Sequence, residues 1–436
     1  MSKSIVIQES VLRQIIYTIL VSQCSLTVGM CLEWRNDDGE TENDWSTSEN
    51  MSKTLIYGGA IISAGPAALI ASMQTKLREV LIIGMLFTLC GSIIVLMCST
   101  GALSTLITGR ILHGMGAGIV CVVVPNYAAE ITEPKYRDVL TGLHPVFLLS
   151  GMMLSHFADD YCTYSHVNIG IIVCMTISNL IALCFIEDPP CFQLIFYENL
   201  RKSESDCKSI DVSSNSCHKL LRNRDIDKII DLSSIFTKKQ YYRPLLINIC
   251  LICIQQFRGN ISLMDKLQCA YGGKLPLSEM ISTITGFQLI SSIFCLIIVS
   301  FLGKKNVLII SGLGMTITLT LAIATLYYMK SLDGLWLPYL IVMYIIFYSI
   351  GYGPIPWILM PQICPRKSKL WTSGVTVSLY AFLNLIINQP FINNIRYMLY
   401  MSCGVDIFLL IFTVVSAIGT VFACMFIPKI KDRTPS

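Results

Sequence analysis

Runs of about twenty apolar residues recur along almost the whole chain, and they decide which solvent it can fold in. A helix needs about 20 such residues to cross the hydrocarbon of a bilayer. Runs of this length lie near residues 11–32, 54–74, 80–99, 104–130, 139–158, 167–186, 244–264, 280–302, 306–328, 336–360, 371–392 and 404–427. The sequence therefore predicts an all-α membrane protein with twelve transmembrane helices.

The composition agrees with folding in a membrane. Of the 436 residues, 53% are hydrophobic and 14% are charged, whereas about a quarter of the residues of a soluble domain are charged. The net charge is only +4, and no basic block follows the pattern of nucleic-acid binding. We therefore expect the lipid bilayer, and no nucleic acid, as a partner.

Metal and cofactor chemistry find no support in the sequence. The 18 cysteines are mostly scattered singly through apolar runs, where cysteine acts as a small apolar residue. One CxxC spacing occurs, at Cys250 and Cys253, but it lies within an apolar run, and the five histidines lie far apart, so no metal site is expected. No ATP-binding motif or catalytic triad is present either. The sequence predicts no cofactor and no enzymatic activity.

A polar stretch divides the chain into two sets of six helices. The predicted organisation is an N-terminal six-helix half (1–186), a cytoplasmic linker with short helices (187–243) and a C-terminal six-helix half (244–436). The end of the linker alternates apolar and charged residues, which is typical of a short amphipathic helix on the membrane face. A disordered tether is the alternative for the same stretch.

The distribution of Lys and Arg predicts the orientation. Most of the 32 basic residues fall on the side of the N-terminus, and cytoplasmic loops are the basic ones, so both termini are expected in the cytoplasm. The first outer loop is acidic and carries the acceptor triplet Asn50-Met51-Ser52, which predicts glycosylation at Asn50. The acidic loop and its acceptor triplet indicate that the protein is located in the plasma membrane.

Two arginines, Arg110 and Arg258, lie within apolar helices. A charge inside the membrane is costly and is a functional hypothesis by default. Arg258 follows Gln255 by about one helical turn. It either points into a transport pathway or extends to the outer surface with its charged end in water, and the sequence leaves both open.

An internal repeat relates the two sets of helices. Glu130 is followed seven residues later by Arg137, and Gln362 is followed seven residues later by Lys369. Both pairs end a helix at the predicted cytoplasmic face. Two similar six-helix halves are the organisation of transporters whose halves rock around a site near the bilayer midplane.

Three stretches make the chain resemble a known family. They are "GRILHGMGAGIVCVVVPNYAAEITEPKYR" at 109–137, "QQFRG" at 255–259 and "GYGPIPWILMPQICP" at 351–365. The sequence resembles the sugar porters of the major facilitator superfamily, and looks closest to insect trehalose-transporter-like proteins. The resemblance implies the major facilitator fold, a small-molecule sugar as substrate, and uniport, since no acid lies between Ile15 and Leu32, where proton-coupled relatives carry one.

The resemblance also implies a gate at the cytoplasmic face. Gly114 and Gly118 form a GxxxG pair that allows close helix approach. The ionic residues of the gate would hold the inner side shut: Arg78, Glu130, Arg137, Gln362 and Lys369. Alternatively, the same charged residues only anchor the helix ends at the membrane surface and do not open and close a gate. Gln362 stands where the family carries a glutamate, so we expect a weaker gate in the second half and fewer molecules in the outward-open state.

Five residues match family positions that contact the sugar: Gln255, Gln256, Gln288, Trp357 and Asn384. Amides can donate and accept hydrogen bonds with hydroxyl groups, and the Trp357 ring can pack on a sugar ring. Taken without the family, amides in membrane helices often join helices to one another. Pro145 stands where many members carry a polar glutamine.

These observations predict facilitative transport of a hexose or trehalose-like sugar by alternating access. Two alternatives remain. The first is a diverged sugar-sensing or inactive member that does not transport. The second is a carrier for an anionic small solute that Arg258 would recognise. The oligomeric state is not predicted.

Overall fold

The computed structural model describes most of the membrane-embedded chain. The described residues are 2–34, 42–74, 76–97, 103–161, 165–187, 238–258, 277–328, 336–365, 368–387 and 405–428. All regular secondary structure within these ranges is helical. The predicted short helix at the end of the linker, at residues 226–232, lies outside the described residues.

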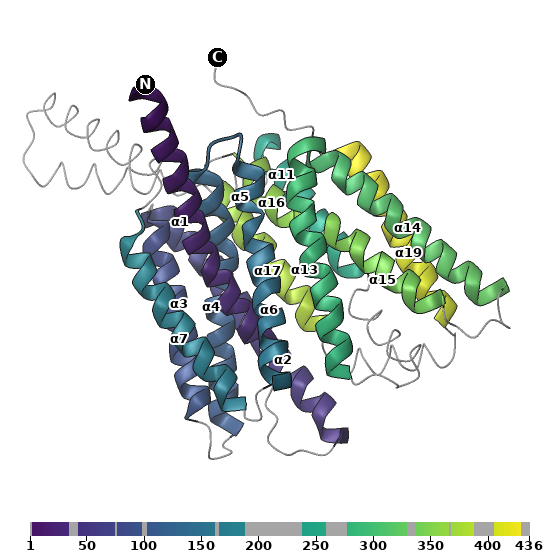
Figure 1. The fold of residues 1–436 in the computed structure, drawn as a ribbon, viewed down its shortest axis with the longest axis horizontal. Coiled ribbons are helices and arrows are strands. Elements are labelled where there is room, and N and C mark those ends of the chain that lie inside the picture. The colour runs from purple at the N-terminus through teal and green to yellow at the C-terminus, as the bar shows by residue number, and fades with distance from the viewer. Residues whose placement is uncertain are drawn as a thin grey trace, which may run out of the picture.

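In the part of the chain that the structure describes, seven helices belong to the first half: α1 (Ser2–Glu33), α2 (Glu42–Gln74), α3 (Leu77–Leu96), α4 (Leu103–Ile131), α5 (Arg137–Thr141), α6 (Leu143–Tyr161) and α7 (Ser165–Phe185). Seven more build the second half: α11 (Lys239–Phe257), α13 (Leu277–Leu302), α14 (Lys304–Tyr328), α15 (Trp336–Ile350), α16 (Ile355–Ile363), α17 (Lys369–Ile387) and α19 (Val405–Phe426). Figure 1 shows the first half in purple to teal beside the second half in green to yellow.

Eleven spans in the described ranges are long and apolar enough to cross a membrane. The segment predicted at 244–264 differs, because α11 ends at Phe257 and is not among the eleven. Lys239, Arg243 and the paired amides of Gln255 and Gln256 lower its hydropathy. The expected first outer loop also differs, since α2 begins at Glu42, so the backbone at Asn50 is helical.

Glycine and proline break the tenth spanning segment in two. α15 ends at Ile350 and α16 begins at Ile355. The N–H of Gly353 still bonds the carbonyl of Tyr348, whereas Pro354 has no N–H to donate and fixes its own φ. Gly353 and Pro354 thus account for the break, and the carbonyl of Gly353 is left to accept from a side chain of another helix, Gln255.

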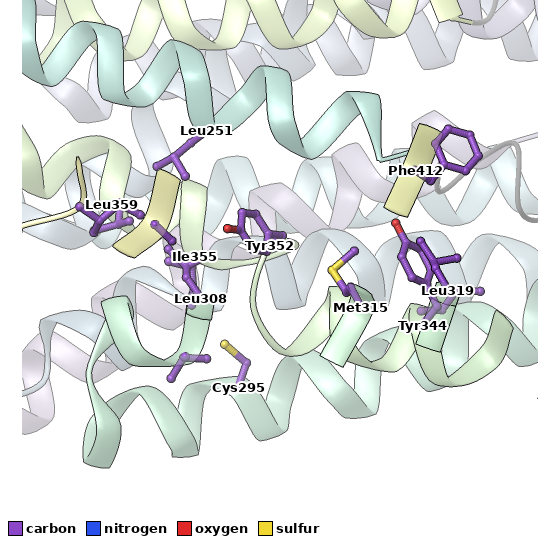
Figure 2. Packing of buried hydrophobic residues seen from close by; sticks show 14 of the residues in the cluster. Leu251, Cys295, Leu308, Met315, Leu319, Tyr344, Tyr352, Ile355, Leu359 and Phe412 are labelled. Carbon is purple, nitrogen blue, oxygen red and sulfur yellow. The ribbon is translucent and has the colours of Figure 1, made fainter. Parts of the chain in front are cut away.

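Each half has an apolar core of its own. In the first half, Val21, Leu81, Val120 and Leu183 come from different helices and are almost completely buried together. In the second half, the core includes Leu251, Met315, Tyr344 and Tyr352, which Figure 2 shows among their neighbours. Separate cores allow each half to behave as one body.

Glycines set the spacing of helices inside the first half. A Cβ at Gly114 would collide with the backbone of Ile56, and one at Gly118 would collide with Ser63 and the backbone of Ala60. α2 therefore lies in backbone contact with α4, as the GxxxG pair predicts. Gly59 of α2 faces α4 in the same way.

The two halves meet along two seams. α2 packs against α17, and α6 packs against α13, as the neighbouring positions of α6 and α13 in Figure 1 also show. A Cβ at Gly374 of α17 would lie 2.5 Å from the Ala68 side chain of α2. A residue larger than glycine at position 374 would therefore push the seam apart.

Candidate functional site

The indole of Trp357 lies where the two halves meet. Trp357 is in the first turn of α16, directly after the helix break, and is 7% exposed. Its ring makes an edge contact with Tyr380 of α17 at 5.1 Å between centroids. It makes another with His144 of α6 at 5.3 Å. Trp357 therefore joins side chains from both halves.

His144 is held from the other side by the first helix. The Oγ of Ser25 in α1 lies 2.7 Å from the Nδ1 of His144, and both residues are buried. α1 and α6 approach closely enough to allow this bond, because Gly29 and Gly151 each face the backbone of the opposite helix. Helices α1, α6, α16 and α17 thus converge on one aromatic cluster, formed by His144, Trp357 and Tyr380.

The structure brings two of the predicted amides next to this cluster. Gln255 of α11 is 4% exposed and donates through Nε2 to the carbonyl of Gly353 at 3.0 Å, one turn before Trp357. Asn384 of α17 is 4% exposed and donates to the carbonyl of Tyr380 at 2.9 Å. Both amides bond to the backbone of the elements that carry the aromatic rings.

The other two predicted amides are placed less specifically. Gln288 is 8% exposed and belongs to α13, the helix that packs on α6. Gln256 is half-buried, next to Gln255 on α11. Gln288 thus lies near the seam and Gln256 beside Gln255, and among the described residues neither amide has a hydrogen bond that would fix its direction.

Ion pairs connect the halves at the end of the bundle where α1 begins. Lys369 of α17 lies 3.0 Å from Glu130 of α4, and the two side chains are 8% and 14% exposed. Lys304 of α14 lies 2.5 Å from Asp138 of α5 and also donates to Gln362 at 2.6 Å. Two lysines of the second half are thus bound to two carboxylates of the first.

The arginines of the predicted gate bond to backbone carbonyls nearby. Arg78 donates to the carbonyl of Ile186 at 3.1 Å, and Arg137 donates to that of Thr132 at 3.2 Å. The ion pair of Glu130 is with Lys369 of the second half. The pairs Lys369–Glu130 and Lys304–Asp138 therefore connect one half to the other.

Sequence reasoning missed three residues of this arrangement as candidates. Asp138 directly follows Arg137, and Lys304 lies in the basic loop that repeats the one at Lys76 and Arg78. A search for acids and bases at matching ends of opposite halves would have paired them. His144 gave no signal by itself, because a single histidine in an apolar run is usually packed in a core.

Arg258 lies inside the second half. It is completely buried, its guanidinium lies 3.2 Å from the centroid of the Tyr352 ring, and Nη1 is 2.9 Å from the Sδ of Met315. Tyr344 donates to its backbone carbonyl. These neighbours belong to the second-half core, and the side chain is buried there rather than extended to the outer surface.

Comparisons with known proteins agree over almost the whole chain. Residues 32–435 match the family described as "Sugar (and other) transporter". The chain is 25% identical over 425 residues to the sugar transporter ERD6-like 6 of Arabidopsis thaliana, covering 91% of this chain and 82% of that protein. It is 25% identical over 353 residues to the facilitated trehalose transporter Tret1 of Culex quinquefasciatus, covering 77% and 66%.

Solved structures show the same fold. The proton:xylose symporter XylE bound to 6-bromo-6-deoxy-D-glucose superposes with a TM-score of 0.77 at 15% identity, covering 98% of each chain. The TM-score falls to 0.60 against the inward open conformation of XylE. The fold is that of the major facilitator superfamily. The protein is a multi-pass integral membrane protein, and the chain belongs to the sugar transporter family.

Proposed function

We propose that this protein is a facilitative sugar carrier that works by alternating access. The observation that carries the proposal is the placement of the aromatic cluster, with Gln255 and Asn384 beside it, between two halves that ion pairs close at one end. Amides and aromatic rings fit the hydroxyl groups and the apolar faces of a sugar. The substrate is a hexose or a trehalose-like sugar.

The sugar would lie against residues contributed mainly by the second half. In this proposal Gln255, Gln256, Gln288 and Asn384 bind hydroxyls, and Trp357 packs on the ring. Gln255 and Asn384 now bond backbone carbonyls, so each can exchange a carbonyl for a sugar hydroxyl at a small net cost. The domain boundaries that we propose remain 1–186, 187–243 and 244–436.

The gate consists of the charges between the halves at the cytoplasmic end. Opening to the cytoplasm requires the pairs Lys369–Glu130 and Lys304–Asp138 to separate. Arg78 and Arg137 bond to carbonyls within the first half and would hold the ends of its helices in place. Gln362 supports Lys304 as a neutral acceptor, in line with a weaker gate in the second half.

Uniport is the proposed mode of transport. The spanning part of α1 contains no acid before Glu33, and Glu33 is paired with Lys53 at 3.1 Å. A carboxylate that changes its proton during transport needs access to the pathway, whereas this one is bound to a lysine at the outer end of α2. Uptake independent of a proton gradient is therefore expected.

Counterflow in proteoliposomes tests the function. Labelled glucose and trehalose are offered to wild type, to Gln255→Ala and to Asn179→Ala. Asn179 is a buried amide that bonds Thr27 within the first half, so it controls for loss of an amide that only joins helices. We expect counterflow by wild type and Asn179→Ala, and loss in Gln255→Ala.

The outcomes separate the hypotheses. Sugar binding without counterflow in folded wild type would favour the sugar-sensing alternative, and neither binding nor counterflow would refute the proposal. Counterflow that depends on a proton gradient would refute uniport alone. The anion-carrier alternative loses its motivation, because the guanidinium of Arg258 packs within the second-half core.

The proposed location is the plasma membrane, with both termini in the cytoplasm and a glycan on Asn50. The support is the excess of basic residues on the side of the N-terminus and the acceptor triplet at Asn50. Protease protection of a tag on either terminus in intact cells tests the orientation.

A further inference from the structure

One buried histidine connects the two halves and keeps a polar atom free. His144 is 1% exposed. Its Nδ1 lies 2.7 Å from Ser25 Oγ in the first half, and its ring contacts Trp357 in the second half at 5.3 Å between centroids, with 62° between the ring planes. Its Nε2 is buried and has no hydrogen-bond partner among the described residues. A buried polar atom of this kind needs an explanation.

We propose that the Nε2 of His144 binds one hydroxyl of the transported sugar and so determines which sugars are selected. The inference rests on the proposed function and names a residue outside the set that sequence reasoning assigned to the sugar. It is carried by the position of the ring against Trp357, at the seam of the halves, and by the unpaired nitrogen.

A hydroxyl is the ligand that fits either tautomer of the ring. If Ser25 donates to Nδ1, the proton of the neutral imidazole is on Nε2, which then donates to the ligand. If Nδ1 donates to Ser25, Nε2 accepts from the ligand. A hydroxyl both donates and accepts, so a sugar satisfies Nε2 in each case, while Ser25 keeps the ring in one orientation.

His144 is the second residue of α6, the helix that packs against α13 of the second half. Pro145 follows within the first turn, where its missing N–H costs no helical hydrogen bond. Its side chain offers no hydrogen bond. In the same turn, Val146 packs on Leu296 and Ile358 of the second half, so the start of α6 lies at the contact between the halves.

A second buried histidine provides a matched control. His113 of α4 lies 2.9 Å from Ser92 Oγ of α3, and its other ring nitrogen likewise has no hydrogen-bond partner in the described part of the chain. It lies against Gly91 of α3, inside the first half. His113 therefore shares burial, a serine partner and an unpaired nitrogen with His144, but not the position between the halves.

Deoxy-sugar analogues identify the hydroxyl. Counterflow of labelled glucose or trehalose, whichever wild type carries, is measured with analogues lacking one hydroxyl each as competitors. We expect His144→Phe to raise the half-saturation constant of the parent sugar about tenfold, equivalent to about 1.4 kcal/mol. The variant should also stop discriminating against one particular deoxy analogue, while His113→Phe keeps the wild-type pattern.

The outcomes also separate this inference from the proposed function. If wild type carries sugar and His144→Phe keeps every discrimination ratio, His144 does not bind the substrate and the carrier function stands. Should His144→Phe fail to fold, His144→Gln decides, since its amide replaces the imidazole with different geometry: a ratio changed at one hydroxyl supports the inference, and unchanged ratios overturn it. If wild type neither binds nor carries either sugar, the proposed function is refuted together with the inference.

Discussion

The ion pair between Lys369 and Glu130 should control how often the end of the bundle that we propose to be cytoplasmic opens. The nitrogen and oxygen are 3.0 Å apart, and the side chains are only 8% and 14% exposed. Removing one partner of a mostly buried pair leaves the other charge without compensation and costs about 2–5 kcal/mol. We take the lower limit, because both groups lie at the end of the bundle.

Lys369→Met therefore destabilises the closed form relative to the open form by about 2 kcal/mol, which corresponds to about 30-fold in the equilibrium constant. Hydrogen exchange measured by mass spectrometry reports this change. The junction between α4 and α5 is held by backbone bonds from Tyr136 to Glu133 and from Leu140 to Tyr136. Exchange there should become about 30-fold faster if it proceeds through the open form.

Two further variants make the reasoning refutable. Glu130→Gln combined with Lys369→Met leaves neither charge buried alone, so exchange should return part of the way to the wild-type rate. Lys53→Met removes the pair with Glu33 at the opposite end and should leave the α4–α5 junction unchanged. Equal exchange in wild type and Lys369→Met, or no recovery in the double variant, would show that this pair does not hold the gate.

Three other changes have expected outcomes. Gly374→Val forces α17 away from Ala68, so exchange at the cytoplasmic end should rise as in Lys369→Met; unaltered exchange would contradict the close packing. Gln362→Glu places a carboxylate 2.6 Å from Lys304 and should strengthen the gate by about 1 kcal/mol, seen as about fivefold slower exchange; faster exchange would argue against it. Asn50→Gln should abolish the glycosidase-sensitive mass of protein made in insect cells, and an unchanged mass shift would place the glycan elsewhere.

The sequence was sufficient for the architecture because bilayer thickness leaves little freedom. Apolar runs of about 20 residues predicted the helices, and eleven of the twelve meet the criteria of length and hydropathy in the described part of the chain. The exception, α11, is the segment where Gln255 and Gln256 replace apolar residues. The polar residues that suggested a site are the ones that weakened the helix signal.

Contacts between the halves were harder to predict. Lys369 and Glu130 are separated by 239 positions, and no local pattern distinguishes a partner on the same half from one on the other. Arg258 shows the same limit, because its burial beside Tyr344 and Tyr352 depends on where those two residues lie. Such choices follow from packing, which a one-dimensional pattern does not contain.

Arg110 has a consequence for how the protein enters the membrane during synthesis. Its guanidinium donates to the carbonyls of Cys31 at 2.8 Å and Trp34 at 2.5 Å and lies over the Trp34 ring. An arginine inside an inserting helix opposes partition by about 2.5–3.5 kcal/mol. These acceptors are at the end of α1, which has already been synthesised when α4 emerges. α4 should therefore leave the translocation machinery together with α1, which makes the first four helices a single unit of insertion.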